Sequence, residues 1–204
     1  VDPYGLAKYH AEQHLNLLSD IHGMKVFHVV PHNVCGPNQC YSDPFRNVLS
    51  IFANRVIHDK PIYVYGDGNQ KRSFSHVNDC VEAFVTLVAN KDTIENKSVF
   101  NIGPDHGSEI TINSLAAKVH RQFNKETNII YSPARPREVL DAWVSTDKAQ
   151  TVLGYLTTKS TDETVEDTIN WIKASPKLSF NYHLDLEIIN ESTPKTWVNK
   201  LFNT

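Results

Sequence analysis

Apolar residues recur at helical spacing at the start of the chain, and a short continuous apolar run follows them. The spacing predicts an amphipathic helix over residues 4–21 that begins after Pro3 and ends at Gly23. The apolar run predicts a buried strand over residues 25–30. The expected apolar face of the helix is made of Ala7, Ala11, Leu15 and Leu18.

Predicted strands and helices keep alternating through the middle of the chain. Past a polar loop over 33–44, the pattern predicts helices over about 45–58, 78–89, 111–123 and 145–153, and extended segments over 62–64, 73–76, 99–102 and 128–131. A last helix begins near Thr161, with Thr161 or Thr164 as its cap. The side chains of the 78–89 helix that we expect to face the core are Val81, Phe84, Val85 and Val88. Such alternation predicts an α/β protein.

The pattern changes after Pro176. Leu184, Leu186 and Ile188 alternate with polar residues and predict a strand, and a short terminal helix is predicted from Pro194. The sequence assigns no function to this last segment; core packing or a subunit contact is the expected use.

Composition narrows the class of protein. The chain has 204 residues, 21% of them charged, with a formal net charge of −3, so it has no strong basic field to hold nucleic acid. No apolar run approaches the length of a membrane span, and no signal peptide opens the chain. An odd number of cysteines (Cys35, Cys40 and Cys80) suits a reducing compartment. We therefore expect a cytoplasmic protein without a membrane or nucleic-acid partner.

Two pairs of residues are spaced like metal ligands. Cys35 and Cys40 lack the second pair that a structural site needs. His10 and His14 occur in the order His-Ala-Glu-Gln-His, whereas zinc proteases have Glu directly after the first His. We expect no metal site.

Two other patterns carry chemistry of their own. Tyr4 and Lys8 lie one helical turn apart, so the ammonium group can approach the phenol and favour its phenolate form, which makes Tyr4 a candidate general base. Gly66 and Gly68 flank an aspartate in a turn that needs left-handed backbone angles. Arg72 follows this turn, and its planar guanidinium suits a diphosphate.

Four segments in this order resemble the extended short-chain dehydrogenase/reductases that act on nucleotide sugars, above all the UDP-glucose 4-epimerases. They are Tyr4-Gly-Leu-Ala-Lys8, Pro31-His-Asn-Val-Cys-Gly-Pro37, the stretch from Tyr63 to Asp79, and Arg135-Pro-Arg-Glu138. The resemblance implies a doubly wound Rossmann-like domain with a small α/β substrate-binding lobe. It also implies NAD as cofactor, a UDP-sugar as substrate, and a homodimer formed through the Tyr4–Lys8 helix.

The resemblance assigns roles at the reacting end of the site. Tyr4 would take the proton of the sugar hydroxyl while hydride passes to NAD, and Lys8 would also hold the nicotinamide ribose. Pro31 and His32 stand where the family backbone passes the nicotinamide, and Asn33 matches an asparagine that contacts the substrate diphosphate. The chain departs from the family at two other positions, with valine at 30 and cysteine at 35 in place of the usual arginine and tyrosine.

The resemblance also assigns the nucleotide end. Arg72 and Arg135 correspond to a diphosphate clamp, Glu138 to an acid that holds the ribose, and Tyr65 to an aromatic that packs on uracil. The remaining substrate-binding residues are Tyr63, Val48, whose backbone would approach the substrate at a helix start, and Ala142, whose small side chain would leave room for a 2-acetamido group.

The glycine-rich dinucleotide fingerprint is missing from this sequence, because Gly66-Asp-Gly68 is followed by Lys71 and not by a third glycine. We therefore expect the C-terminal part of a longer enzyme. Residues 1–40 would be the catalytic helix and next strand of an incomplete Rossmann domain, 41–175 mainly the nucleotide-sugar lobe, and 176–204 an extension. The expected activity is 4-epimerisation; a 4,6-dehydratase, a uronate decarboxylase and a non-catalytic nucleotide-sugar-binding fragment stay open.

Overall fold

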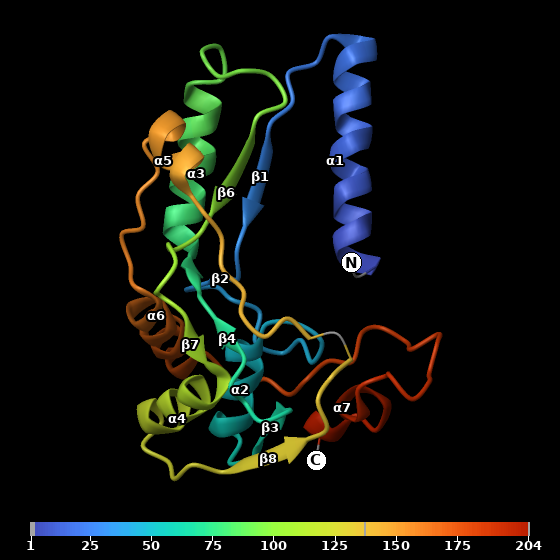
Figure 1. The fold of residues 1–204 in the computed structure, drawn as a ribbon. Helices are drawn as coiled ribbons and strands as arrows, with labels where there is room; N and C mark the ends of the chain where they lie inside the picture. Colours follow the sequence, from blue (N-terminus) through green and yellow to red (C-terminus); the bar gives the residue numbers. More distant parts are fainter. Residues whose placement is uncertain (1–2, 137, 204) are drawn as a thin grey trace.

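The computed structural model describes residues 3–136 and 138–203, and these residues form a chain of short strands and helices (Figure 1). The elements are α1 (Pro3–His22), β1 (His28–Pro31), β2 (Val34–Cys35), α2 (Val48–Ile57), β3 (Ile62–Tyr65), β4 (Lys71–Arg72), β5 (Ser75–His76), α3 (Val77–Ala89), β6 (Val99–Ile102), β7 (Ile110–Thr111), α4 (Ile112–Gln122), β8 (Ile129–Ser132), α5 (Asp147–Leu153), α6 (Thr161–Ala174), α7 (Lys195–Val198) and a final 3-10 turn (Leu201–Asn203). None of the helices in this part of the chain is long and apolar enough to cross a membrane.

One hydrophobic core lies around the parallel pair β1–β6, where His28 pairs with Val99 and Pro31 with Ile102. Helices α3 and α5 pack against this pair, which fills the upper half of Figure 1. The buried side chains are Cys80, Ala83, Leu87, Ile94, Phe100, Ile102, Ala149, Leu153 and Tyr155.

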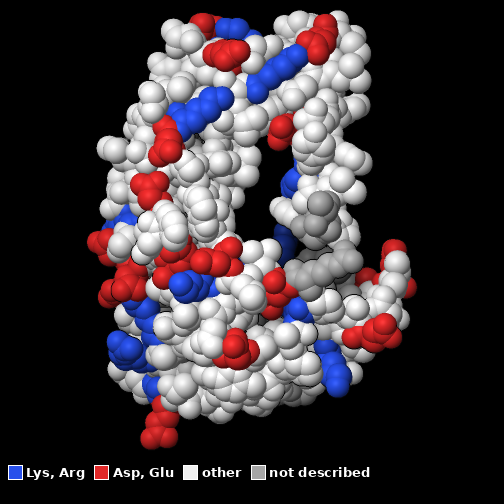
Figure 2. All heavy atoms as spheres, viewed as in Figure 1, with Lys and Arg blue, Asp and Glu red and all other residues white. Residues whose placement is uncertain are grey.

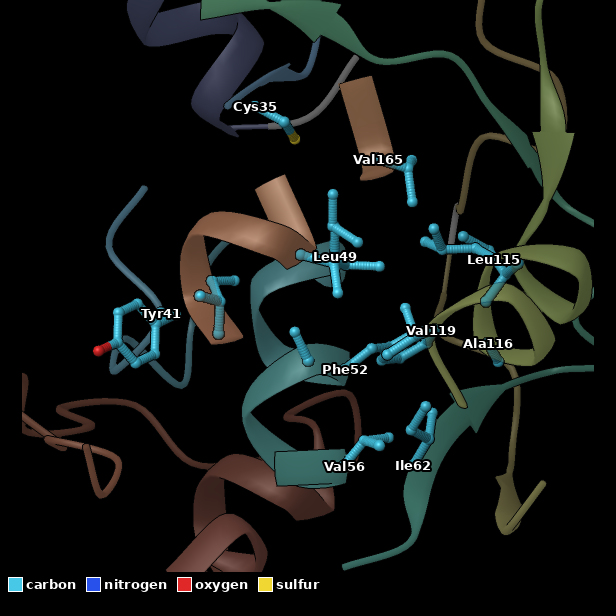
Figure 3. Packing of buried hydrophobic residues seen from close by; sticks show 14 of the residues in the cluster. Cys35, Tyr41, Leu49, Phe52, Val56, Ile62, Leu115, Ala116, Val119 and Val165 are labelled. Atoms are coloured by element: carbon cyan, nitrogen blue, oxygen red, sulfur yellow. The ribbon is translucent and has the colours of Figure 1, made fainter. Parts of the chain in front are cut away.

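A second, larger core joins α2, α4 and α6 to β3, which pairs in parallel with β8 (Figure 3). Leu49 and Leu115 are completely buried in it, and burial of a leucine of this kind contributes about 1.5–3 kcal/mol. The parallel pair β2–β5 lies between the two cores, and the antiparallel pair β4–β7 follows the glycine turn. Gly66 and Gly68 take the expected left-handed angles, with φ of 69° and 76°.

Helix α1 is bound to the rest of the protein near its C-terminal end. Asn16 Oδ1 lies 2.9 Å from His28 Nε2, and Asp20 forms an ion pair with Lys97. Ser19 is the one buried side chain of the helix. The expected apolar face of α1 is largely exposed, and an opening separates the middle of the helix from the body of the molecule (Figure 2).

The prediction for the core face of α3 was wrong. Val81, Phe84, Val85 and Val88 are 47–66% exposed, and the smaller Cys80 and Ala83, with Leu87, face the core instead. The helix has apolar residues on more than one face, so periodicity alone did not fix its rotation. A buried carboxylate does so: Asp79 Oδ2 accepts a hydrogen bond of 3.0 Å from the backbone N–H of Thr158.

Two further predictions were wrong. The cap of α6 is Ser160, whose hydroxyl and the Glu163 carboxylate form a capping box, while Thr161 and Thr164 are buried inside the helix. The strand expected over residues 184–188 is not formed; this segment runs as irregular chain. Leu184 and Ile188 are 57% and 77% exposed, so the alternation of apolar residues did not reflect pairing with another strand.

Candidate functional site

The four segments singled out in the sequence meet along one side of the α2 lobe. Tyr4 comes from the start of α1, Asn33 follows β1, and Val48 is the first residue of α2. Tyr65 ends β3 and Arg72 ends β4, while Arg135 and Glu138 lie in the loop after β8. Segments distant in sequence are thus brought to a single surface by parallel pairing and by the packing of α2.

Two neighbouring cavities form the site. The larger has a volume of about 600 Å³ and is lined by Tyr4, Asn33, Asn47 and Val48, among other residues. The smaller, about 200 Å³, is below the ~300–1,000 Å³ typical of pockets that enclose a whole drug-sized ligand. Asn47 and Val48 line both cavities, so the two cavities adjoin each other at the start of α2, and we call them together the groove.

Tyr4 lines the larger cavity at one end of the groove, and Lys8 lies beside it on α1. Lys8 Nζ lies 5.5 Å from the centroid of the Tyr4 ring, and Tyr4 is 72% exposed. The pair therefore faces open space at the edge of the larger cavity and is accessible to a ligand.

His32 follows the C-terminal end of β1, where parallel α/β sheets bind nucleotides. Burial lowers the pKa of His32, opposed by a hydrogen bond to the Ala142 backbone, and the positive charge of Arg72 lowers it further. Among the described residues no partner binds the buried His32 Nε2. A neutral imidazole with one ring nitrogen to spare is a group that a bound ligand can satisfy.

Asn33 and Asn47 shape the middle of the groove. Asn33 has a positive φ of 44° and donates one amide N–H to the Ser73 carbonyl at 2.9 Å, which leaves a second N–H on the same amide. Asn47 caps α2 by accepting from the Ser50 N–H, and its amide nitrogen lies 3.3 Å from the Val34 carbonyl. The N-terminus of α2, with its positive end of the helix dipole, therefore points at the groove.

Sequence reasoning missed Asn47. An asparagine directly before the apolar run that starts at Val48 is the signal that could have found it, because asparagine is among the preferred caps.

The end of the groove predicted to bind the nucleotide has two guanidinium groups around one carboxylate. Arg135 Nη2 lies 2.6 Å from Glu138 Oε1, and Arg72 Nη2 lies 3.5 Å from the same oxygen. Burial lowers the pKa of Arg72, whereas Glu138 raises it. Two arginines and one glutamate leave a net positive charge, as an anion site requires. Arg135 also lies over the Tyr65 ring, 5.3 Å from its centroid.

The C-terminal segment lines this end of the groove as well. Thr196, Trp197 and Phe202 line the same cavity as Tyr63, Tyr65, Arg72, Arg135 and Glu138. This contact was not predicted, because no motif marks the segment in the sequence. Among the predicted substrate-binding residues, Ala142 lines neither cavity and lies instead against His32.

Metal ligands do not gather in the part of the chain that the structure describes: no three His, Cys, Asp or Glu side chains are close enough to hold an ion.

Comparison with known proteins identifies relatives of this arrangement. Residues 1–103 match the model of the NAD dependent epimerase/dehydratase family. A putative UDP-glucose 4-epimerase of Methanocaldococcus jannaschii is 29% identical over 175 residues, which are 85% of this chain and 54% of that protein. UDP-glucuronic acid decarboxylase 1 of Arabidopsis thaliana is 36% identical over 101 residues, 50% of this chain and 21% of that protein.

A solved structure agrees with these relatives. The crystal structure of a Thermotoga maritima UDP-glucose 4-epimerase with UDP-glucose superposes with a TM-score of 0.74 and 27% identity, over 85% of this chain and 54% of that one. The predicted α/β fold of the Rossmann-like epimerase type is confirmed. The chain spans about half the length of the curated epimerases that it matches.

Proposed function

The chain belongs to the NAD dependent epimerase/dehydratase family, and from this premise we propose that it supplies the nucleotide-sugar site and the Tyr–Lys pair of a UDP-sugar 4-epimerase. The observation that carries the proposal is the groove, in which Tyr4 lines one cavity, the Arg72, Arg135 and Glu138 cluster lines the other, and Val48 lines both.

The chemistry divides along this groove. The two guanidinium groups would bind the diphosphate. Glu138 would then give up part of its contact with the arginines and accept hydrogen bonds from the ribose hydroxyls. The N-terminus of α2 would add backbone donors beside Val48. A sugar held in this way extends toward Tyr4.

NAD, when bound, supplies the hydride acceptor for oxidation of the sugar C4 hydroxyl. Tyr4 would take the hydroxyl proton, and Lys8 would stabilise the phenolate and hold the nicotinamide ribose. His32, with its free buried Nε2 and its place after β1, fits the nicotinamide end of the cofactor. The sequence has no glycine-rich turn for the cofactor pyrophosphate, so these residues account for one end of NAD only.

The first test is whether this chain binds UDP-glucose in a calorimetric titration. We expect Arg135→Ala to weaken binding by about 10- to 150-fold, the usual effect of losing hydrogen bonds to a charged group. Arg121→Ala is the matched control, since Arg121 is exposed on α4, away from the residues that line the groove. The absence of UDP-glucose binding by the unaltered chain would refute the proposal.

A uronate decarboxylase is a second candidate, because the Arabidopsis relative is a UDP-glucuronic acid decarboxylase. The two candidates differ in their products when a longer enzyme containing this chain acts on UDP-glucuronic acid. Release of carbon dioxide indicates the decarboxylase, and interconversion with UDP-galacturonic acid indicates the epimerase. Tyr4→Phe should abolish either reaction while UDP-glucose still binds, because the tyrosine hydroxyl is needed for proton transfer and not for the clamp.

The size of the sugar is a separate hypothesis. Ala142 is small and half-buried beside His32, which would leave room for a 2-acetamido group. Turnover of UDP-N-acetylglucosamine and UDP-glucose by the longer enzyme tests it, and a strong preference for UDP-glucose would contradict it.

A further inference from the structure

The C-terminal segment, residues 176–203, is bound to the lobe in its first and its last part. Its first part is fixed by two side-chain donors: the Tyr41 hydroxyl donates to the Pro176 carbonyl at 2.5 Å, and Asn54 donates to the Leu178 carbonyl at 2.9 Å. Its last part is fixed by Arg55, whose Nη1 donates to the carbonyls of Leu201 and Phe202. Figure 1 shows this segment passing beside β3 and ending near α7.

The segment reaches the nucleotide end of the groove at α7. The Thr196 hydroxyl lies 2.6 Å from the Tyr65 hydroxyl, and Thr196 is 1% exposed. The ring of Phe45 contacts that of Trp197 edge to face, with centroids 5.4 Å apart. This contact fixes the indole where it lines the cavity of about 200 Å³. Thr196 and Trp197 are therefore held in place before any ligand arrives.

The chemistry of this wall differs from that of the opposite side. Arg72, Arg135 and Glu138 provide charge, whereas the C-terminal segment provides two aromatic rings (Trp197 and Phe202) and a hydroxyl to the cavity. Aromatic rings with a few polar groups suit a planar heterocycle, and charge suits a diphosphate. A cavity of this volume accepts the base and not the whole nucleotide sugar.

We propose that the C-terminal segment forms the base-binding wall of the nucleotide site, with Trp197 contacting the pyrimidine and the Thr196 and Tyr65 hydroxyls next to its polar edge. The inference rests on the proposed function, since it names the part of that same site which recognises the base. It also gives a role to a segment outside the residues 1–103 that match the family model.

The test compares two ligands on the whole chain: UDP, which has a base, and inorganic pyrophosphate, which has none. Trp197→Ala should weaken UDP binding by about 5- to 150-fold, the range for loss of one aromatic contact with a base, and change pyrophosphate binding by less than about twofold. Trp197→Phe keeps an aromatic ring and should retain most of the UDP affinity. Ile188→Ala is the matched control, because Ile188 is in the same segment and 77% exposed.

Arg135→Ala separates the failure of this inference from the failure of the proposed function. If the unaltered chain binds neither ligand, the proposed function fails and this inference with it. If Arg135→Ala weakens the binding of both ligands while Trp197→Ala binds UDP as tightly as the unaltered chain, only the base-binding wall is refuted. Equal loss of both ligands in Trp197→Ala would also overturn it, because the segment would then act on the whole site. Should Trp197→Ala fail to fold by circular dichroism, Trp197→Leu, which keeps apolar bulk without a ring, takes its place with the same expected outcomes.

Discussion

Arg55 joins the C-terminal segment to the lobe, and its replacement is a direct test of how that segment is held. The side chain is 2% exposed at the end of α2, and its Nε donates to the Pro61 carbonyl at 2.9 Å. Its Nη1 donates to Leu201 and Phe202, at 3.2 and 3.0 Å. The guanidinium carbon also lies 5.3 Å from the centroid of the Tyr63 ring.

The replacement Arg55→Met keeps an unbranched apolar stem and removes every donor. A hydrogen bond to a charged group contributes about 1.5–3 kcal/mol to stability. The sum over the three hydrogen bonds of Arg55 is an upper limit for the loss of unfolding free energy, and we expect a smaller loss for two reasons. The carbonyls of Leu201 and Phe202 can regain water when the segment detaches, and the cost of burying the guanidinium, which lowers the pKa of Arg55, disappears. We expect the free energy of unfolding to fall by about 2–4 kcal/mol.

Two measurements check this expectation. Urea unfolding followed by circular dichroism gives the change in stability, and limited trypsin digestion with mass spectrometry reports cleavage at Lys195 and Lys200. We expect Arg55→Met to lose the C-terminal segment at least about tenfold faster than the unaltered chain. Arg121→Met, at an exposed position on α4, should stay within about 0.5 kcal/mol. If Arg55→Met unfolds at the same urea concentration as the unaltered chain and keeps its segment protected, Arg55 does not anchor the segment.

Two further predictions concern a turn and the thiols. Gly68→Ala should destabilise the protein by about 1–3 kcal/mol in urea unfolding and by more than Gly107→Ala. Both positions have positive φ, but of the two only Gly68 would place the new Cβ against the side-chain oxygen of Asn113. An equal loss of stability in the two variants would exclude a steric clash at Gly68. Burial raises the pKa of Cys35 to about 12 and of Cys80 to about 11, so at pH 8 about 10⁻⁴ and 10⁻³ of these thiols are ionised. Iodoacetamide should modify the exposed Cys40 first, and the other two at comparable rates only after unfolding; three equally fast thiols would contradict this.

Local patterns in the sequence were enough to predict most elements. Helices α1 to α6 and the four-residue strands β1, β3, β6 and β8 follow from hydrophobic spacing and from local stop signals such as Gly23 and Gly154, because these depend on neighbours in sequence. The two-residue strands β2, β4 and β7 were not predicted. The motif order predicted the epimerase family, and the family match confirms it. The individual roles of Tyr4, Arg72 and Arg135 stay proposals.

Rotation of a helix and the pairing of a segment depend on partners distant in the sequence. The 78–89 pattern contained two possible apolar faces, and the contact of Asp79 with Thr158 decided which one is buried. The alternating residues 184–188 suited a strand, but no strand lies beside them in the described structure, so their backbone stays irregular.

Hydrophobic spacing and motif order were sufficient to assign the family and the α/β class. Packing between distant segments set the candidate site: Val48 and Asn47 line two neighbouring cavities, Glu138 lies between Arg72 and Arg135, and the C-terminal segment lines the smaller cavity. Composition and spacing report only on contacts within a few residues. A cavity, in contrast, is built by side chains such as Tyr65 and Thr196, which are 131 positions apart and meet only after the lobe has packed.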